Sequence, residues 1–405
     1  MMDETAYLPA DEGYAWVICL ASFVMQACAV GVISGMGVFM EHYTNNVFPT
    51  EKKSKVAMIV NLAPVVLGVG SLVTGRVCQR FGVRVCVVLG AFTMMSGLVL
   101  ASFGTQVWRF ALSQGVMVGF GAALIFVPAN VAIAEWFEKR RGLAAGLGAA
   151  GGGIGGAAFA QLNSCILPVV GLRYTLQING GVVLVVLLLS AAMVRRRESK
   201  ASTECEETRF DKSLVLNGKF GFFAVASFFG GAAYFIPLYY INNHAVLLGM
   251  NKQEAGVVGS TINIGSAIGR VSMGFLGDYI GYVNCYILAI ALSALTSIIW
   301  RFSTSFTMLI VFGILYGIPS GGYAGGFGPT CAAIFGKRQL ATMMGLVYSF
   351  GGVGELVGPI LCGFLIDTFN NYSLIIYFTI ICYATTCLAM IVANVFVIRA
   401  PPHGI

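Results

Sequence analysis

The sequence predicts an all-α membrane protein of twelve transmembrane helices, arranged as two six-helix bundles related by pseudo-symmetry. Three observations support this fold: apolar segments of about 20 residues recur along the chain, few residues are charged, and motifs of the first half return in the second. Of the 405 residues, 58% are hydrophobic and 10% are charged. A soluble domain carries about 25% charged residues, so this composition suits a surface that faces lipid.

The apolar segments define twelve expected helices, each long enough to cross a hydrocarbon core of about 30 Å. We place them at residues 14–40, 56–76, 84–103, 108–134, 142–166, 172–194, 219–241, 254–277, 283–301, 305–333, 340–366 and 372–397. An even number of spans puts both termini on one side. That side holds 16 Lys and Arg against seven on the other, and this excess predicts cytoplasmic termini.

A polar stretch at 195–218, which begins with three arginines, divides the chain into near-equal halves. Its polar composition predicts a solvated cytoplasmic linker. We therefore expect an N-terminal six-helix bundle over 1–194 and a C-terminal six-helix bundle over 219–405.

Two motifs occur once in each half. Gly75, Gln79 and Gly82 share a glycine–polar–glycine spacing with Gly274, Asp278 and Gly281, 199 residues later. Likewise FEKRRGLAAG at 137–146, which contains Lys139, Arg140 and Arg141, is similar to FGKRQLATMMG 198 residues later. Two motif pairs at one offset predict a parallel duplication with its axis along the membrane normal.

The glycine motifs are expected to form tight turns between neighbouring helices. Their polar residue, together with the nearby Arg80 and Arg84, can cap helix ends and bridge helices at the inner face. Such a bridge would latch one gating state; a plain cytoplasmic turn is the alternative. The Gly/Ala-rich run at 142–156 predicts a helix that packs against a neighbour at close range.

These features resemble the major facilitator superfamily, whose loop between helices 2 and 3 carries Gly-x3-Asp-Arg-x-Gly-x-Arg. Gly75, Arg80, Gly82 and Arg84 match that pattern, while Gln79 replaces its acid.

A narrower resemblance is to the monocarboxylate transporter family. DEGYAW at 11–16 is similar to its helix 1 signature, with departures at Glu12 and Ala15. WFEKRRGLAAGLGAAGGGIGG at 136–156 is similar to its helix 5 signature.

The candidate substrate site centres on Arg270, about 10 Å from the expected inner end of its helix. An ionisable residue inside a membrane helix is a functional candidate because its burial is costly, and a guanidinium offers a planar fork to a carboxylate. The resemblance implies that an arginine here engages an anionic substrate; a structural pair or an inner latch is the alternative. Further wall residues are Ser34, Asn263, Tyr234, Tyr323 and Ser266.

Two positions depart from the proton-coupled members of the resembled family. Those members carry an aspartate four residues before the arginine, where this chain has Ser266, and a helix 1 lysine, near which this chain has Ser34. Glu355, about 22 Å from the expected inner end of its helix, is therefore the candidate carrier of a coupled proton. A packing role or a place near the outer vestibule is the alternative.

The sequence predicts a secondary transporter of a small organic anion, a monocarboxylate by resemblance, that works by alternating access with possible proton coupling. The alternatives are a carrier of another organic solute such as a vitamin, or a substrate-sensing receptor on a transporter scaffold. No P-loop, HExxH or GxSxG motif appears, which argues against an enzyme. We expect a monomer in the lipid bilayer of the plasma membrane, with no cofactor, no metal site and no nucleic-acid partner.

Overall fold

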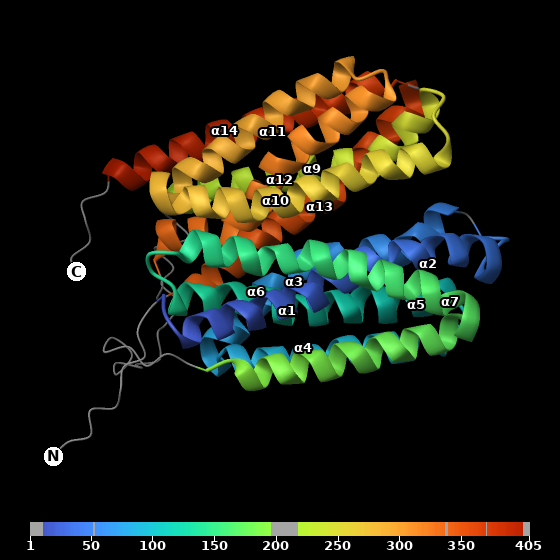
Figure 1. Ribbon diagram of the computed structural model, residues 1–405, viewed down its shortest axis with the longest axis horizontal. Helices are drawn as coiled ribbons and strands as arrows, with labels where there is room; N and C mark the ends of the chain where they lie inside the picture. Colours follow the sequence, from blue (N-terminus) through green and yellow to red (C-terminus); the bar gives the residue numbers. More distant parts are fainter. Residues whose placement is uncertain (1–10, 52, 196–217, 337–338, 370, 400–405) are drawn as a thin grey trace.

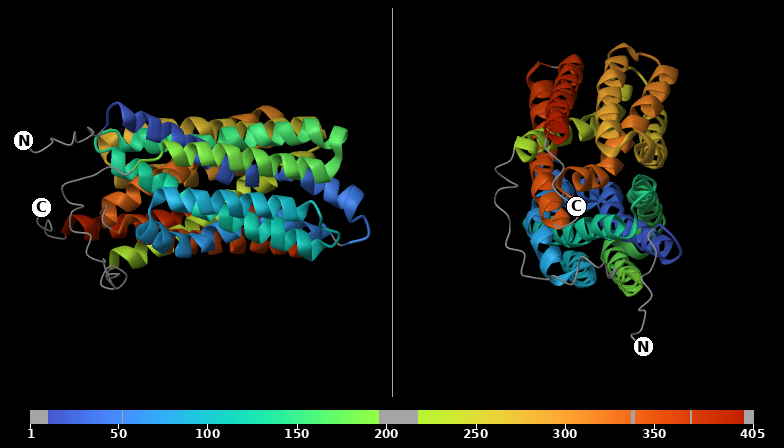
Figure 2. Two further views of the ribbon diagram at one scale, coloured as in Figure 1. Left: turned by 90° about the horizontal axis from the view of Figure 1, so that it is seen from below. Right: turned by 90° about the vertical axis from the view of Figure 1, so that its left-hand side faces the viewer.

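Two helical bundles lie side by side with their long axes roughly parallel (Figure 1). The computed structural model describes residues 11–51, 53–195, 218–336, 339–369 and 371–399. Within these ranges the chain forms helices and short connections and contains no strand. The view from one end separates the helices of the first half from those of the second (Figure 2).

The first bundle runs from α1 to α7. Its elements are α1 (Tyr14–Gly35), α2 (Gly37–His42), the π-helix η1 (Tyr43–Val47), α3 (Lys53–Phe81), α4 (Val83–Ala101), α5 (Val107–Phe110), the π-helix η2 (Ala111–Met117), α6 (Val118–Trp136) and α7 (Arg141–Met193). The second bundle consists of α9 (Gly218–Leu247), α10 (Lys252–Ile280), α11 (Tyr282–Phe302), α12 (Phe306–Phe335), α13 (Leu340–Phe369) and α14 (Tyr372–Arg399).

Twelve spans result from these elements. Ten helices of the described chain are long and apolar enough to cross a membrane. One of them, α7, contains 53 residues and breaks at Gly171, whose φ of 76° is non-helical, so it makes two antiparallel spans. The 29-residue α10 is less apolar because it carries Lys252, Glu254, Arg270 and Asp278, and it makes the twelfth span. The predicted fold class is confirmed.

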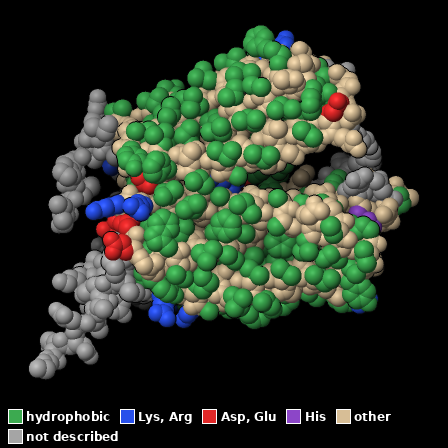
Figure 3. Space-filling model, in the orientation of Figure 1, with side chains coloured by type: hydrophobic (Ala, Val, Ile, Leu, Met, Phe, Trp, Pro, Cys, Tyr) green, Lys and Arg blue, Asp and Glu red, His purple; other side chains and the backbone are tan. Residues whose placement is uncertain are grey.

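The long sides of the molecule suit contact with lipid. Large apolar side chains such as Val69, Leu189, Ile264 and Leu388 are exposed there. Hydrophobic side chains cover this face, while charged ones gather towards its ends (Figure 3). Soluble proteins rarely expose apolar surface on this scale, so the long sides of the molecule suit contact with the hydrocarbon interior of a bilayer.

The two ends of the molecule differ. We call the end with the turns at Gly82 and Gly281 the motif end, and the opposite end, with the break at Gly171, the far end. Every close approach between the bundles that involves a glycine lies in the half nearer the motif end; the approach of Gly68 to Gly352 is among the deepest. Towards the far end a cleft separates the bundles (Figure 3).

The contacts between the bundles repeat at the offset found in the sequence. Gly142 of α7 packs on Gly274 of α10, and 199 residues away Ala341 of α13 packs on Gly75 of α3. One turn deeper, Gly146 approaches the backbone carbonyl of Arg270, and Gly345 approaches that of Ser71. The interface therefore consists of two equivalent helix crossings, α7 with α10 and α3 with α13.

One expectation for the glycine motifs is wrong. Gly82 and Gly281 do occupy turns, with φ of 83° and 89°. Gly75 and Gly274 instead lie inside helices, where a Cβ would overlap the backbone of the opposite bundle. Those two glycines serve close packing between helices, which membrane interfaces favour. The predicted linker at 195–218 lies outside the described residues apart from its two ends, so the domain boundaries stay a prediction.

Candidate functional site

Asp278 joins the two bundles at the motif end. Its carboxylate accepts hydrogen bonds from the backbone N–H of Gly142 at 2.7 Å and of Leu143 at 2.9 Å, at the start of α7. The hydroxyl of Tyr282 donates a third bond, at 2.9 Å. The N-terminus of a helix carries unpaired N–H groups and a partial positive charge, so a carboxylate from the other bundle stabilises the closed motif end.

The equivalent contact in the other crossing is neutral. The hydroxyl of Thr342, near the start of α13, donates a hydrogen bond to the side-chain oxygen of Gln79 on α3. Gln79 and Thr342 stand 199 residues from Asp278 and Leu143. The two latches therefore occupy equivalent positions, but one uses backbone N–H donors and the other a side-chain hydroxyl, and only the α7–α10 latch contains a full charge.

Replacing Asp278 with asparagine is expected to favour the state that is open at the motif end. The variant loses the negative charge and one acceptor, and charge-assisted hydrogen bonds contribute about 1.5–3 kcal/mol each. The ratio of open to closed molecules should therefore rise about tenfold or more. Spin labels at the exposed positions Val85 and Tyr279 report it as a longer distance.

Tyr282→Phe is the matched control for this prediction, because it removes one bond to Asp278 and leaves the carboxylate on α7. Its label distances should stay near those of the wild type. Equal shifts in the two variants would contradict a latch based on the charge of Asp278.

The two signatures of the resembled family meet at the motif end. The Asp11 carboxylate accepts hydrogen bonds from the backbone N–H of Glu138 at 3.2 Å, Lys139 at 3.0 Å and Arg140 at 2.9 Å. The ring of Trp16 packs edge-on against that of Phe137, with 5.3 Å between centroids. The helix 1 signature thus fixes the loop that leads into α7.

The same signature also holds the other end of α7. Tyr14 donates from its hydroxyl to the carbonyl of Met193 at 2.6 Å. Arg84 donates to the carbonyls of Ala191 at 3.0 Å and Ala192 at 3.1 Å, and Trp136 to that of Arg195 at 3.0 Å. These donors satisfy carbonyls that a helix C-terminus leaves unpaired. Of the other motif side chains, Arg141 bonds the carbonyl of Phe137 and Arg80 lies over the ring of Phe81.

Asp11 makes the stability of this end depend on pH. Burial alone would raise the pKa of its carboxyl, but the three backbone N–H bonds outweigh burial and lower that pKa. A lowered pKa in the folded state contributes stability above the ordinary value of about 3.9, and this contribution is lost as pH falls through the folded value.

Asp11→Ala is expected to lower the melting temperature at neutral pH, by an amount that corresponds to about 1 kcal/mol or less. The difference from the wild type should vanish well below pH 4. A thiol-reactive dye can follow unfolding, because most of the described cysteines are buried. Glu12→Ala, at the exposed next position, is the control and should melt like the wild type.

Among the close approaches of α7 glycines to α10, Arg270 is the residue farthest from the motif end. Its Nη1 donates to the carbonyl of Ala149, in the opposite bundle, at 2.5 Å. Its Nη2 is 3.5 Å from the hydroxyl of Tyr234, and its Nε is buried with no partner in the described structure. Nε and Nη2 form the side-on edge of a guanidinium, which binds a carboxylate through two hydrogen bonds. On that edge Nε has no partner in the described structure, and Nη2 has only the long contact with Tyr234.

The other predicted wall residues divide into two groups. The ring of Tyr234 lies 5.8 Å from that of Tyr323, so both are near Arg270, and Ser266 lies one turn away with a buried hydroxyl that has no partner. Ser34 and Asn263 are exposed, and neither hydrogen bonds to Arg270 in the described chain. Ser34 packs next to Gly156 of α7. The structure therefore brings four of the six predicted residues together, counting Arg270.

Glu355 extends the face of α13 that meets the first bundle. Gly345, Tyr348 and Gly352 on this face touch Ser71, Phe126 and Gly68. Glu355 follows Gly352 by three residues, close to one helical turn, so it lies on the same face about 4.5 Å further along the helix. Glu355 therefore lies where the bundles begin to separate. Tyr348, which sequence reasoning missed, forms the floor there, and its spacing from Gly345 and Gly352 is the signal that could have found it.

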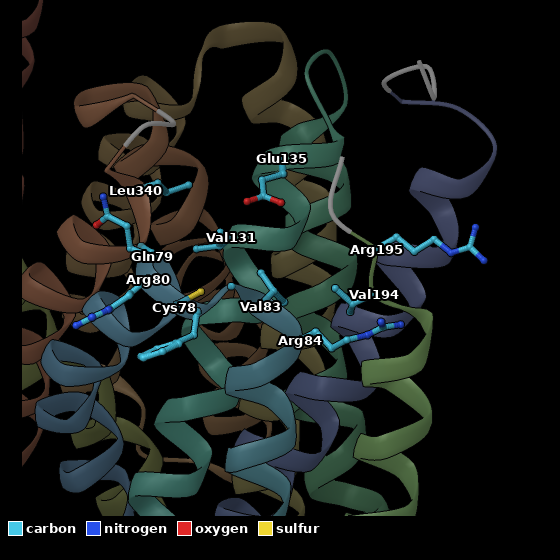
Figure 4. Close-up of a pocket in the computed structure, with 13 residues that line it drawn as sticks. Cys78, Gln79, Arg80, Val83, Arg84, Val131, Glu135, Val194, Arg195 and Leu340 are labelled. Carbon is cyan, nitrogen blue, oxygen red and sulfur yellow. The ribbon is translucent and has the colours of Figure 1, made fainter. Parts of the chain in front are cut away.

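A separate cavity of about 490 Å³ lies at the motif end, between the α3–α4 turn, α6 and the start of α13. Arg84 and Arg195 extend to one side of it and Arg80 to the other, and Glu135 of α6 is set above the turn (Figure 4). This cavity is on the closed side of the interface, and it does not include Arg270 or Glu355.

The fold and the site define a two-bundle membrane transporter with a cleft between its halves. The Major Facilitator Superfamily model matches residues 18–251 and 220–405, so the chain belongs to this family. Its members are transporters and not enzymes.

Individual relatives agree with this assignment. The chain is 25% identical to the agnestins efflux protein AgnL12 of Paecilomyces divaricatus, over 95% of this chain and 87% of that one. It is 28% identical to monocarboxylate transporter 13 of Rattus norvegicus, over 90% and 85%. A crystal structure of FucP in the outward conformation has a TM-score of 0.70 at 15% identity, over 94% and 98%.

Proposed function

We propose that the protein is a secondary transporter that moves a small organic anion, a monocarboxylate, across a membrane by alternating access. The observation that carries this proposal is the side-on edge of Arg270, where Nε is buried without a partner in the described structure and Nη2 has only a long contact with Tyr234. A positive charge held inside the membrane with an incompletely hydrogen-bonded edge favours a ligand carboxylate, because an unpaired buried charge is costly.

The two latches support an alternating mechanism. With the motif end closed by Asp278 and Gln79, the substrate enters from the far end and reaches Arg270. Rocking of the bundles then breaks both latches and opens the motif end. Glu355, beside the same cleft, carries the coupled proton in this scheme.

The excess of Lys and Arg near the motif end favours placing that end in the cytosol. We propose a monomer in the plasma membrane, because each chain contains both bundles and its own cleft.

Uptake of radiolabelled lactate and pyruvate into proteoliposomes tests the proposal. Saturable uptake with counterflow is the expected result. Ligand binding without flux would instead support the sensing receptor.

A larger aromatic acid is a second candidate substrate, favoured by the rings of Tyr234, Tyr323 and Tyr348 near Arg270. The similarity to an efflux protein for agnestins is consistent with export. Inhibition of lactate uptake by aromatic acids and riboflavin, compared with inhibition by pyruvate, separates the two candidates.

A further inference from the structure

Two charges of opposite sign lie within the described membrane spans, away from the helix ends: Arg270 on α10 and Glu355 on α13. The remaining charged residues of these spans stand near one end or the other. Arg270 has no acidic partner in the described chain, and its hydrogen bonds go to Ala149 and Tyr234. No hydrogen bond or ion pair of Glu355 is found within the described residues.

Both charges belong to the second bundle, and the duplication gives them no partner in the first. The residues equivalent to Arg270 and Glu355 at the 199-residue offset are Ser71 and Gly156. The stretches of the first bundle that face α13, at 64–72 of α3 and 122–131 of α6, contain no titratable side chain. Those stretches of the first bundle therefore supply no counter-charge, and a ligand with both charges can pair with each residue directly.

The two residues flank one site. The hydroxyl of Tyr234 on α9 is 3.5 Å from Nη2 of Arg270. On its other side α9 packs tightly on the turn of α13 that carries Glu355, where Gly354 meets Phe228 and Gly358 meets Ala232. Tyr323 of α12 packs on Tyr234 with 5.8 Å between ring centroids, and Tyr348 stands seven residues before Glu355 on the same face of α13. Tyrosine rings near the site suit an organic cation, which binds to aromatic faces.

We propose that the preferred substrate is a zwitterion, whose carboxylate binds Arg270 while its ammonium group binds Glu355. This inference rests on the proposed binding of a substrate carboxylate by Arg270, and it gives Glu355 the ammonium group of the substrate in place of the coupled proton. Arg270 and an ionised Glu355 sum to zero charge. A zwitterion keeps that sum at zero, whereas a simple carboxylate adds one negative charge and requires a proton on Glu355. An amino acid therefore satisfies the site without a proton, and a hydroxy acid does not.

Matched pairs of solutes test this proposal in proteoliposomes. Alanine and lactate share a carboxylate and a carbon skeleton and differ in an ammonium group or a hydroxyl; phenylalanine and 3-phenyllactate form a larger pair. We expect counterflow at pH 7.5 to favour the amino acid at least about tenfold in one pair or both. Glu355→Gln, which keeps the size of the side chain, should reduce transport of the amino acid and reverse the preference.

The possible failures are distinct. Transport of the hydroxy acids with no preference for the amino acids, or an unchanged preference in Glu355→Gln, would overturn the zwitterion and leave the carboxylate transporter intact. If the wild type moved and bound neither member of either pair, the carboxylate proposal would fall with it. Ligand-induced shifts in melting temperature, measured in detergent on both proteins, give a second readout of preference and show that the variant is folded.

Discussion

Replacing Arg270 with lysine is expected to reduce saturable transport about 10- to 100-fold. Lysine keeps the positive charge but loses the planar edge formed by Nε and Nη2, so a carboxylate can no longer form two parallel hydrogen bonds. Hydrogen bonds to charged groups contribute about 1.5–3 kcal/mol each, and about 1.4 kcal/mol is a factor of ten. Initial rates of counterflow with normally expressed protein measure the loss.

Tyr234→Phe is the control for this experiment. Its hydroxyl lies 3.5 Å from Nη2 of Arg270, a long contact, so its removal should change transport by a few-fold at most. If the lysine variant transported at the normal rate, Arg270 would not be the group that binds the substrate.

Gly146→Ala is expected to weaken the closed state of the motif end and to reduce transport about tenfold. A Cβ at this position would overlap the backbone carbonyl of Arg270, so α7 and α10 must move apart. Overpacking of this kind costs about 1–3 kcal/mol. Gly345→Ala should act in the same direction, because its Cβ would meet the carbonyl of Ser71 in the equivalent crossing. Spin labels at Val85 and Tyr279 measure the opening.

Gly153→Ala on the same helix is the matched control. No atom lies within 4 Å of a Cβ built there, so the substitution changes helix propensity without a clash. Label distances and transport should both stay near wild type. If Gly146→Ala behaved like Gly153→Ala, the close crossing would not determine the closed state.

The spans and the duplication could be predicted from the sequence because both are local patterns. The lengths of the apolar segments predict twelve spans whose ends lie within six residues of the ends in the structure. For example, the span predicted to end at 241 ends at Leu247 of α9. Glycines at matched spacing indicated the repeat. Their roles could not be separated, because turn glycines such as Gly82 and interface glycines such as Gly75 look alike until the opposing helix is known.

The candidate site was less accessible to sequence reasoning. Arg270 and Glu355 stand out because charges within spans are rare, and this signal needs no structure. Their environment depends on which faces meet across the bundles. The sequence does not indicate that the carbonyl of Ala149 accepts a hydrogen bond from Arg270, and the resemblance that pointed to Ser34 does not show that this residue is exposed.

The hydrogen bonds from the helix 1 signature to both ends of α7 constrain the order in which the protein can be assembled. Asp11 and Tyr14 leave the ribosome early, but their partners at Arg140 and Met193 follow about 130 and 180 residues later. The first span must therefore wait in the membrane until the sixth has been inserted. This half of the molecule is therefore completed by residues that were synthesised near its beginning.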